Sequence, residues 1–168
     1  MQNPDSVGFK GAQALGIQHA LPAKLLNDEK AAIYYICENW VSLEKVLGLC
    51  YFVPAPRSFM QVVDVVALVH AATGWDVDLA ELLRMGERAT NMARVFNTRE
   101  GFSRSDDRLP VRLFHPLEGG TSDGASLSEV DFEQALTELY RLKGWDPASG
   151  APTPEKLQSL ELGYLIQG

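Results

Sequence analysis

The chain has 168 residues, 46% of them hydrophobic and 22% charged, which is typical of a globular protein with one buried core or two small ones. Its net charge of −7 and isoelectric point near 4.9 argue against nucleic acid or an anionic membrane as the main partner. No apolar run reaches the roughly 18 residues of a membrane span, and no basic-then-apolar leader is visible. The two cysteines, Cys37 and Cys50, are too few for a disulfide framework, so we expect a reducing, cytoplasmic location.

The first 27 residues are rich in Gly, Pro and Ala without a clean period, which predicts an irregular N-terminal arm over 1–27. A first helix is expected over 28–48, with Asn27 or Asp28 as its N-cap. Its apolar residues recur at spacings of three and four, which predicts one buried stripe. That stripe consists of Ile33, Ile36, Trp40, Leu43, Leu47 and Cys50.

A second helix is expected from a cap at Ser58 to about Thr73, ended by Gly74. Its apolar residues cover nearly all faces, which predicts burial on several sides. A third helix follows, because Asp78 and Glu81 stand in capping-box spacing, and it should end near Asn97. We predict its inner face to consist of Leu79, Leu82, Leu83, Gly86, Ala89, Met92, Ala93 and Phe96, where the small Gly86 and Ala89 allow a neighbouring helix to approach closely.

Residues 113–127 contain a proline, three glycines and several small polar residues, and we interpret them as an exposed loop. A fourth helix is expected over 129–142, stopped by Gly144, and a short last helix begins at Thr153 with Pro154 at its first position. No strand pattern of useful length occurs. The prediction is an all-α fold, an irregular multi-helix domain with long loops over 28–168 that follows the arm.

Cys50 has two interpretations from spacing alone. It can be a small buried hydrophobe that continues the first helix's stripe, or it can be a thiolate ligand of an iron–sulfur cluster. Such clusters usually need four cysteines, and Cys37 lies thirteen residues away, outside any C-x-x-C pair. The chain therefore cannot hold a cluster alone, and Cys37 is interpreted as a core residue.

No catalytic residue is assigned. The three histidines, His19, His70 and His115, lack metal-ligand spacing, and no nucleophile elbow, dinucleotide fingerprint or phosphate loop occurs. His70 lies in the most apolar helix and is interpreted as a core or interface residue. The charged run 97–110 is either a structural loop pinned by ion pairs or a surface that completes a site shared with another domain.

Several motifs together make the chain recognisable. They are Gly48-Leu49-Cys50-x-Phe52, Gly74-Trp75-Asp76, Gly86-Glu87-Arg88, Arg99-Glu100-Gly101, Arg104-x-Asp106-Asp107-x-Leu109-Pro110, and Tyr140-Arg141-Leu142-Lys143-Gly144-Trp145-Asp146. On these motifs residues 25–160 resemble the C-terminal region of the tungsten-containing aldehyde ferredoxin oxidoreductases.

The resemblance implies an N-terminal pterin-binding domain and a middle helical domain that are missing here. It implies a tungsten bis-pterin cofactor and a 4Fe–4S cluster in the complete enzyme, which oxidises aldehydes to carboxylic acids and passes electrons to ferredoxin. Cys50 would be the fourth cluster ligand, and Gly48 and Leu49 would lie near the pterin. The isolated chain is expected to bind no cofactor and to have no activity of its own.

One residue departs from the family pattern Asp-x-x-Gly-Leu-Cys, in which the Asp is expected to bind a pterin. Lys45 stands at that cofactor-binding position, and lysine offers donors only. Either this contact is lost or a neighbour such as Glu44 replaces it, about 100° around the helix. The alternative function is a free-standing helical interaction domain that has lost cofactor binding. Uncovered apolar faces would pair with the missing domains or with a second copy.

Overall fold

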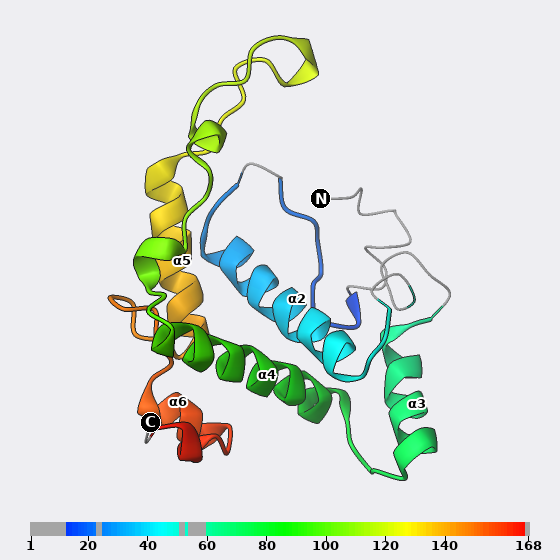
Figure 1. The fold of residues 1–168 in the computed structure, drawn as a ribbon. Coiled ribbons are helices and arrows are strands. Elements are labelled where there is room, and N and C mark those ends of the chain that lie inside the picture. The colour runs from blue at the N-terminus through cyan, green and yellow to red at the C-terminus, as the bar shows by residue number, and fades with distance from the viewer. Residues whose placement is uncertain (1–12, 23–24, 51–52, 54–59, 167–168) are drawn as a thin grey trace. The chain divides into compact units, whose positions relative to one another are not determined.

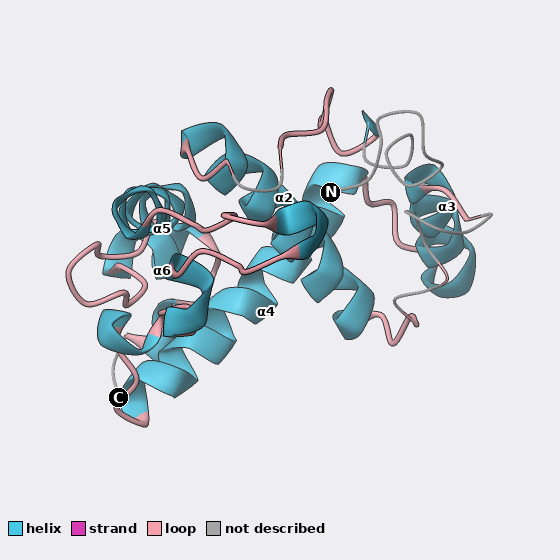
Figure 2. Cartoon of the chain, turned by 90° about the horizontal axis from the view of Figure 1, so that it is seen from above, coloured by secondary structure: helices cyan, strands magenta, loops and turns pink. Residues whose placement is uncertain are grey.

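The computed structural model describes residues 13–22, 25–50, 53 and 60–166 (Figure 1). Its helices are α2 (Asp28–Val46), α3 (Val62–Thr73), α4 (Leu79–Arg99), α5 (Glu129–Lys143) and α6 (Pro154–Ser159). Short 3-10 turns occur at Arg104–Asp106, Val111–Phe114, Gly120–Ser122 and Gly163–Leu165. No strand element occurs in this part of the chain, as the colouring of Figure 2 shows, so the predicted all-α class is confirmed.

The predicted helix starts are mostly confirmed by their caps. Asn27 Oδ1 accepts the Lys30 N–H of α2 at 2.9 Å, and Asp78 Oδ1 accepts the Glu81 N–H of α4 at 2.8 Å. The side chain of Thr153 caps α6, with Pro at the helix start. These side chains satisfy backbone donors that have no partner inside the helix.

The start of α3 differs from the prediction. The described helix begins at Val62 with Gln61 as its N-cap, whose N–H donates to the Asp64 carboxylate at 2.6 Å. The predicted cap Ser58 lies outside the described residues. Gly74 ends α3 as predicted, with φ of +73° and its N–H on the His70 carbonyl at 2.8 Å.

The chain divides into two compact units. The first contains the described residues of Met1–Pro22 and of Ile36–Asn91, and the second those of Ala23–Tyr35 and of Met92–Gly168. The predicted boundary between an arm over 1–27 and a helical domain over 28–168 stays a prediction.

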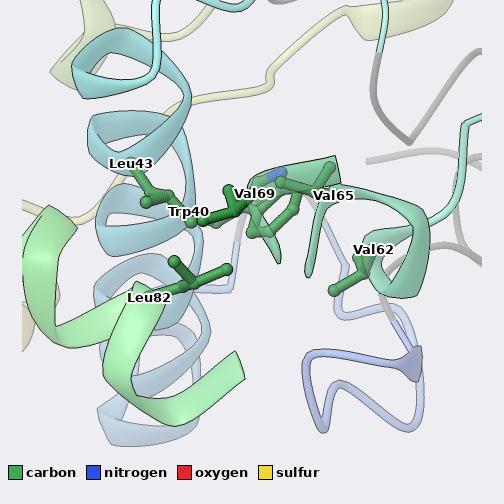
Figure 3. Packing of buried hydrophobic residues seen from close by; sticks show 6 residues of the cluster. All are labelled: Trp40, Leu43, Val62, Val65, Val69 and Leu82. Carbon is green, nitrogen blue, oxygen red and sulfur yellow. The ribbon is translucent and has the colours of Figure 1, made fainter. Parts of the chain in front are cut away.

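The core of the first unit joins three helices. Trp40 and Leu43 of α2 meet side chains of α3 and Leu82 of α4, as Figure 3 shows. The buried members are Trp40, Leu43, Val62, Val65, Val69 and Leu82. The centre of the predicted α2 stripe is therefore confirmed, because its most buried side chains belong to this core.

Helices α2 and α4 approach closely at Gly86. A Cβ atom at Gly86 would lie 2.0 Å from the Asn39 carbonyl oxygen and 2.9 Å from the Leu43 backbone nitrogen. One turn further along α4, the hydroxyls of Ser42 and Thr90 are hydrogen-bonded at 2.9 Å. The predicted close approach is confirmed at Gly86, because any side chain there would collide with backbone atoms.

Two burial predictions are wrong. Helix α3 buries only one stripe, Val62, Val65 and Val69, and its remaining apolar residues are mostly exposed. Within α4, the apolar stripe leaves the core in the last two turns, where Met92 and Phe96 are exposed, as is Ala93. The residues buried instead are Asn91, Arg94 and Val95. Periodicity predicts an apolar face, but in this segment Arg94 is buried with its polar partners and Val95 packs against Leu157, Leu160 and Leu162.

The charged run 97–110 is held by ion pairs in the second unit. Arg94 donates to both carboxylate oxygens of Asp107, at 3.0 and 2.5 Å, and to the Gly150 carbonyl at 2.7 Å. Its guanidinium also lies 4.9 Å from the centre of the Trp145 ring. Tyr140 donates its hydroxyl to Asp107, and burial together with this bond raises the pKa of the phenol.

A second arginine attaches the loop to α5. Arg104 donates to the Glu133 carboxylate at 2.8 Å, to the Thr137 hydroxyl at 2.9 Å and to the Pro147 carbonyl at 2.8 Å. The interpretation of this run as a loop pinned by ion pairs is therefore confirmed.

Candidate cofactor-facing site at the end of helix α2

The end of α2 is shaped by a paired C-cap motif. Gly48 adopts φ of +68°, and its N–H donates to the Lys45 carbonyl at 3.2 Å. The Leu49 N–H donates to the Glu44 carbonyl at 2.8 Å. This is the Schellman pattern, in which glycine is favoured because a Cβ atom disfavours the left-handed conformation. The motif turns the chain away from the helix axis immediately before Cys50.

Cys50 is exposed. The interpretation of this thiol as a buried core hydrophobe is therefore wrong, because the buried stripe of α2 does not extend past the turn at Gly48. The Cys50 carbonyl accepts the Val53 N–H at 2.8 Å. The result is an accessible sulfur at the point where helix changes to loop.

Cys37 differs from Cys50 in its surroundings. It is only partly exposed, and desolvation by burial raises the pKa of its thiol. Because the thiolate is the form that binds metals, a raised pKa disfavours Cys37 as a metal ligand. The interpretation of Cys37 as a core residue agrees with its partial burial.

Lys45 is exposed in the last turn of α2. A cation at this place stabilises the negative end of the helix dipole, which is a sufficient structural reason for a lysine. The side chain offers hydrogen-bond donors and no acceptor. Lys45 therefore does not fit the acceptor contact that the family pattern places at this position.

Glu44, the alternative acceptor, is enclosed within the chain. Its side chain is only 2% exposed, so the chain's own atoms cover the carboxylate. Burial raises the pKa of Glu44 to about 7. The nearby Trp40 indole lowers this pKa by a smaller amount, although its N–H makes no hydrogen bond to the carboxylate. Both carboxylate oxygens lack a hydrogen-bond partner.

Two further buried polar atoms near Glu44 have no partner. They are Asn39 Oδ1 and Trp40 Nε1, on residues that are 6% and 4% exposed. Buried polar atoms are nearly always hydrogen-bonded, so three such side chains within two turns are unusual. Sequence reasoning missed this cluster, because a periodic pattern identifies the buried face but not which polar atoms find partners.

The histidines form no site among the described residues. His70 is exposed, so the core alternative for it is wrong and the interface alternative stays a prediction; its Nδ1 lies 3.0 Å from the Trp75 carbonyl oxygen. His115 is exposed in the loop after Val111–Phe114. Within the described part of the chain, no three His, Cys, Asp or Glu side chains are grouped so that they could hold a metal.

Comparison with known proteins identifies the class of protein. Residues 4–162 match the family model for domains 2 and 3 of aldehyde ferredoxin oxidoreductase. The chain therefore belongs to the aldehyde ferredoxin oxidoreductase family, as its motifs predicted, and it corresponds to the C-terminal region of these proteins.

Similar relatives are tungsten-containing aldehyde ferredoxin oxidoreductases. The protein of that name from Pyrococcus abyssi is 30% identical over 156 residues, which is 92% of this chain and 24% of the relative. The one from Pyrococcus furiosus is 30% identical over 150 residues, and that from Thermococcus kodakarensis is 29% identical over 156. The chain thus spans about a quarter of the length of these relatives.

A solved structure shares the fold. The active-site complex BamBC of benzoyl coenzyme A reductase, determined with 1,5-dienoyl-CoA, matches with a TM-score of 0.67 and 23% identity. The match covers 86% of this chain and 21% of that one.

Among the described residues, no helix is both long and apolar enough to cross a membrane.

Proposed function

We propose that this chain is the C-terminal helical part of a tungsten-pterin, iron–sulfur oxidoreductase that oxidises aldehydes to carboxylic acids with ferredoxin as electron acceptor. The exposed thiol of Cys50, presented by the turn at the end of α2, carries the proposal. It lies within Gly48-Leu49-Cys50, the segment that resembles the family's last cluster cysteine. A missing pterin domain and a missing middle domain supply the other ligands.

The residues of this chain then have a positioning role. Cys50 provides one thiolate to a 4Fe–4S cluster, and the turn formed by Gly48 and Leu49 directs that thiolate out of the fold. When bound, the tungsten-pterin and the cluster supply the redox chemistry. Burial and hydrogen bonds around the thiolate would tune the cluster potential. Lys45 adds a positive charge at the end of α2 but offers no hydrogen-bond acceptor.

Replacement of Cys50 in the complete enzyme tests the proposal. We expect Cys50→Ser to lose the cluster, measured as bound iron and as the absorbance of the iron–sulfur charge transfer. Cys37→Ser is the control, because Cys37 is the chain's other cysteine and is partly buried within α2, and it should keep the full iron content. Full iron in Cys50→Ser would contradict the role of this thiolate.

The second candidate is a free-standing helical interaction domain that kept the fold and lost the cofactor. The exposed Lys45 favours it, because a donor stands where the family pattern has an acceptor. Lys45→Asp in the complete enzyme separates the two functions. An increase in retained pterin supports the oxidoreductase, whereas no increase supports the interaction domain.

A further inference from the structure

Helix α3 presents an apolar surface that nothing in the described structure covers. The helix is apolar on nearly all sides, yet only the stripe Val62, Val65 and Val69 is packed in the core of the first unit. On the remaining surface, Val63 is 64% and Leu68 is 47% exposed. Helices that are apolar all round are normally buried on several sides, so this surface is suited to contact with another protein segment.

An exposed tryptophan, Trp75, directly follows the glycine that ends the helix. Trp75 is 56% exposed, whereas Trp40 and Trp145 are buried. Its N–H donates to the Thr73 hydroxyl at 3.1 Å, and its carbonyl oxygen lies 3.0 Å from His70 Nδ1. These bonds hold the backbone of Trp75 in place. An aromatic side chain on a fixed backbone loses less entropy on binding, which favours it as an interface anchor.

We propose that this α3 outer face, defined by Val63, Ala67, Leu68, Ala71 and Trp75, is an interface with the rest of the multi-domain polypeptide. The length of the relatives supports this occupant, because the chain spans only about a quarter of them. In an enzyme of that length, the other three quarters of the polypeptide can supply the segment that covers this face. Ala67 and Ala71 are exposed and small, so the backbone of a partner helix can approach closely.

Charge argues against a second copy as the occupant. Each chain carries a net charge of −7, so two copies brought together at this face repel one another. The face itself has no charged side chain among its five residues, with Asp64 beside it. An apolar surface on the rest of the multi-domain polypeptide matches the uncharged face.

The inference rests on the proposed function, and its test uses the complete assembly. The chain is expressed with the polypeptide from the same source that covers the remaining length of the relatives. Hydroxyl-radical oxidation of Trp75, read by mass spectrometry, is compared between the chain alone and the complex. We expect at least about fivefold slower oxidation of Trp75 in the complex, because a docked indole is shielded from solvent.

Matched substitutions test the same face. Val63→Glu and Leu68→Glu should weaken the complex at least about tenfold in Kd, because each places a charge in an apolar contact. Val130→Glu is the control, since Val130 is 66% exposed and, like Val63, is the second residue of its helix. We expect Val130→Glu to change Kd by less than about twofold. Thermal unfolding of each variant chain confirms that it is folded.

Three results would overturn the interface. The first is unchanged oxidation of Trp75 in the complex, and the second is equal Kd values for the Val63 and Val130 variants. The third is self-association of the chain that protects Trp75 from oxidation and is abolished by Val63→Glu. That result would assign the face to a second copy. If Cys50→Ser loses iron while Val63→Glu assembles normally, the interface fails and the proposed function stands.

Discussion

The two units of this chain differ in whether a buried charged side chain has hydrogen-bond partners. In the second unit Arg94 is 7% exposed and has an ion pair, a backbone acceptor and an aromatic ring around it. In the first unit Glu44 is 2% exposed and both its oxygens lack partners. An enclosed charge with its partners in place contributes to a defined structure, whereas an enclosed charge without them costs free energy.

Arg94 contributes to the fold through its partners, whereas the burial of Glu44 has no hydrogen bond to stabilise it. Arg94 has its acceptors, Asp107 and the Gly150 carbonyl, within the second unit. The end of α2 combines the unpartnered Glu44 with an exposed thiol at Cys50 six residues later. Local departures from good packing and pairing are expected at functional sites, where selection acts on something besides stability.

The largest expected effect comes from breaking the satisfied network. Asp107→Ala removes the partner of Arg94 and of the Tyr140 hydroxyl, and leaves a buried guanidinium unpaired. We expect a loss of about 3 kcal/mol in the free energy of unfolding, measured by urea denaturation. Glu138→Ala, which breaks the exposed pair with Arg141 at 3.5 Å, should cost less than about 1 kcal/mol. Equal losses would show that the network is not structural.

The next effect concerns the unpartnered carboxylate. Because the pKa of Glu44 is about 7 in the fold and 4.5 for a fully solvated glutamate, the folded state binds more protons than the unfolded state between these values. Stability therefore falls as pH rises through this window, by about 3 kcal/mol in all. Glu44→Gln should remove this slope and be more stable than wild type at pH above about 8, measured by denaturation at a series of pH values. The exposed Glu118→Gln should keep the wild-type slope, and a slope unchanged in Glu44→Gln would contradict the shift.

The smallest effect tests whether polar contacts in the first unit are weak in general. Ser42→Ala removes the 2.9 Å hydrogen bond to Thr90 between α2 and α4. We expect a loss of about 1 kcal/mol in the free energy of unfolding. Ser126→Ala, at an exposed loop position, should change it by less than about 0.5 kcal/mol. No difference between the two variants would mean that the contrast between the units extends beyond Glu44.

Much of the fold could be predicted from local sequence signals. The starts at Asn27, Asp78 and Thr153 and the end at Gly74 follow from side chains that satisfy backbone groups within a few residues, or from a glycine that permits the closing turn. The close approach at Gly86 also followed from residue size alone. Such signals are readable because the interacting groups are neighbours in the chain or lie on one helix face.

Burial was predicted less well. The predicted apolar stripe of α4 reaches Met92 and Phe96, and both are exposed. Residue Cys50 continued the α2 stripe by spacing, yet it lies beyond the turn at Gly48 and is exposed. Periodicity shows which face of a helix is apolar, but it cannot show how far along the helix a partner element extends.

The sequence by itself determined the helices, their caps and the motifs that relate this chain to the aldehyde ferredoxin oxidoreductases. Only the tertiary structure decided that Cys50 is accessible, that Glu44 is enclosed without a donor and that the outer face of α3 is uncovered among the described residues. The physical reason is that caps and periods depend on contacts within a few residues. Exposure and hydrogen-bond satisfaction depend on which distant segments pack against each atom.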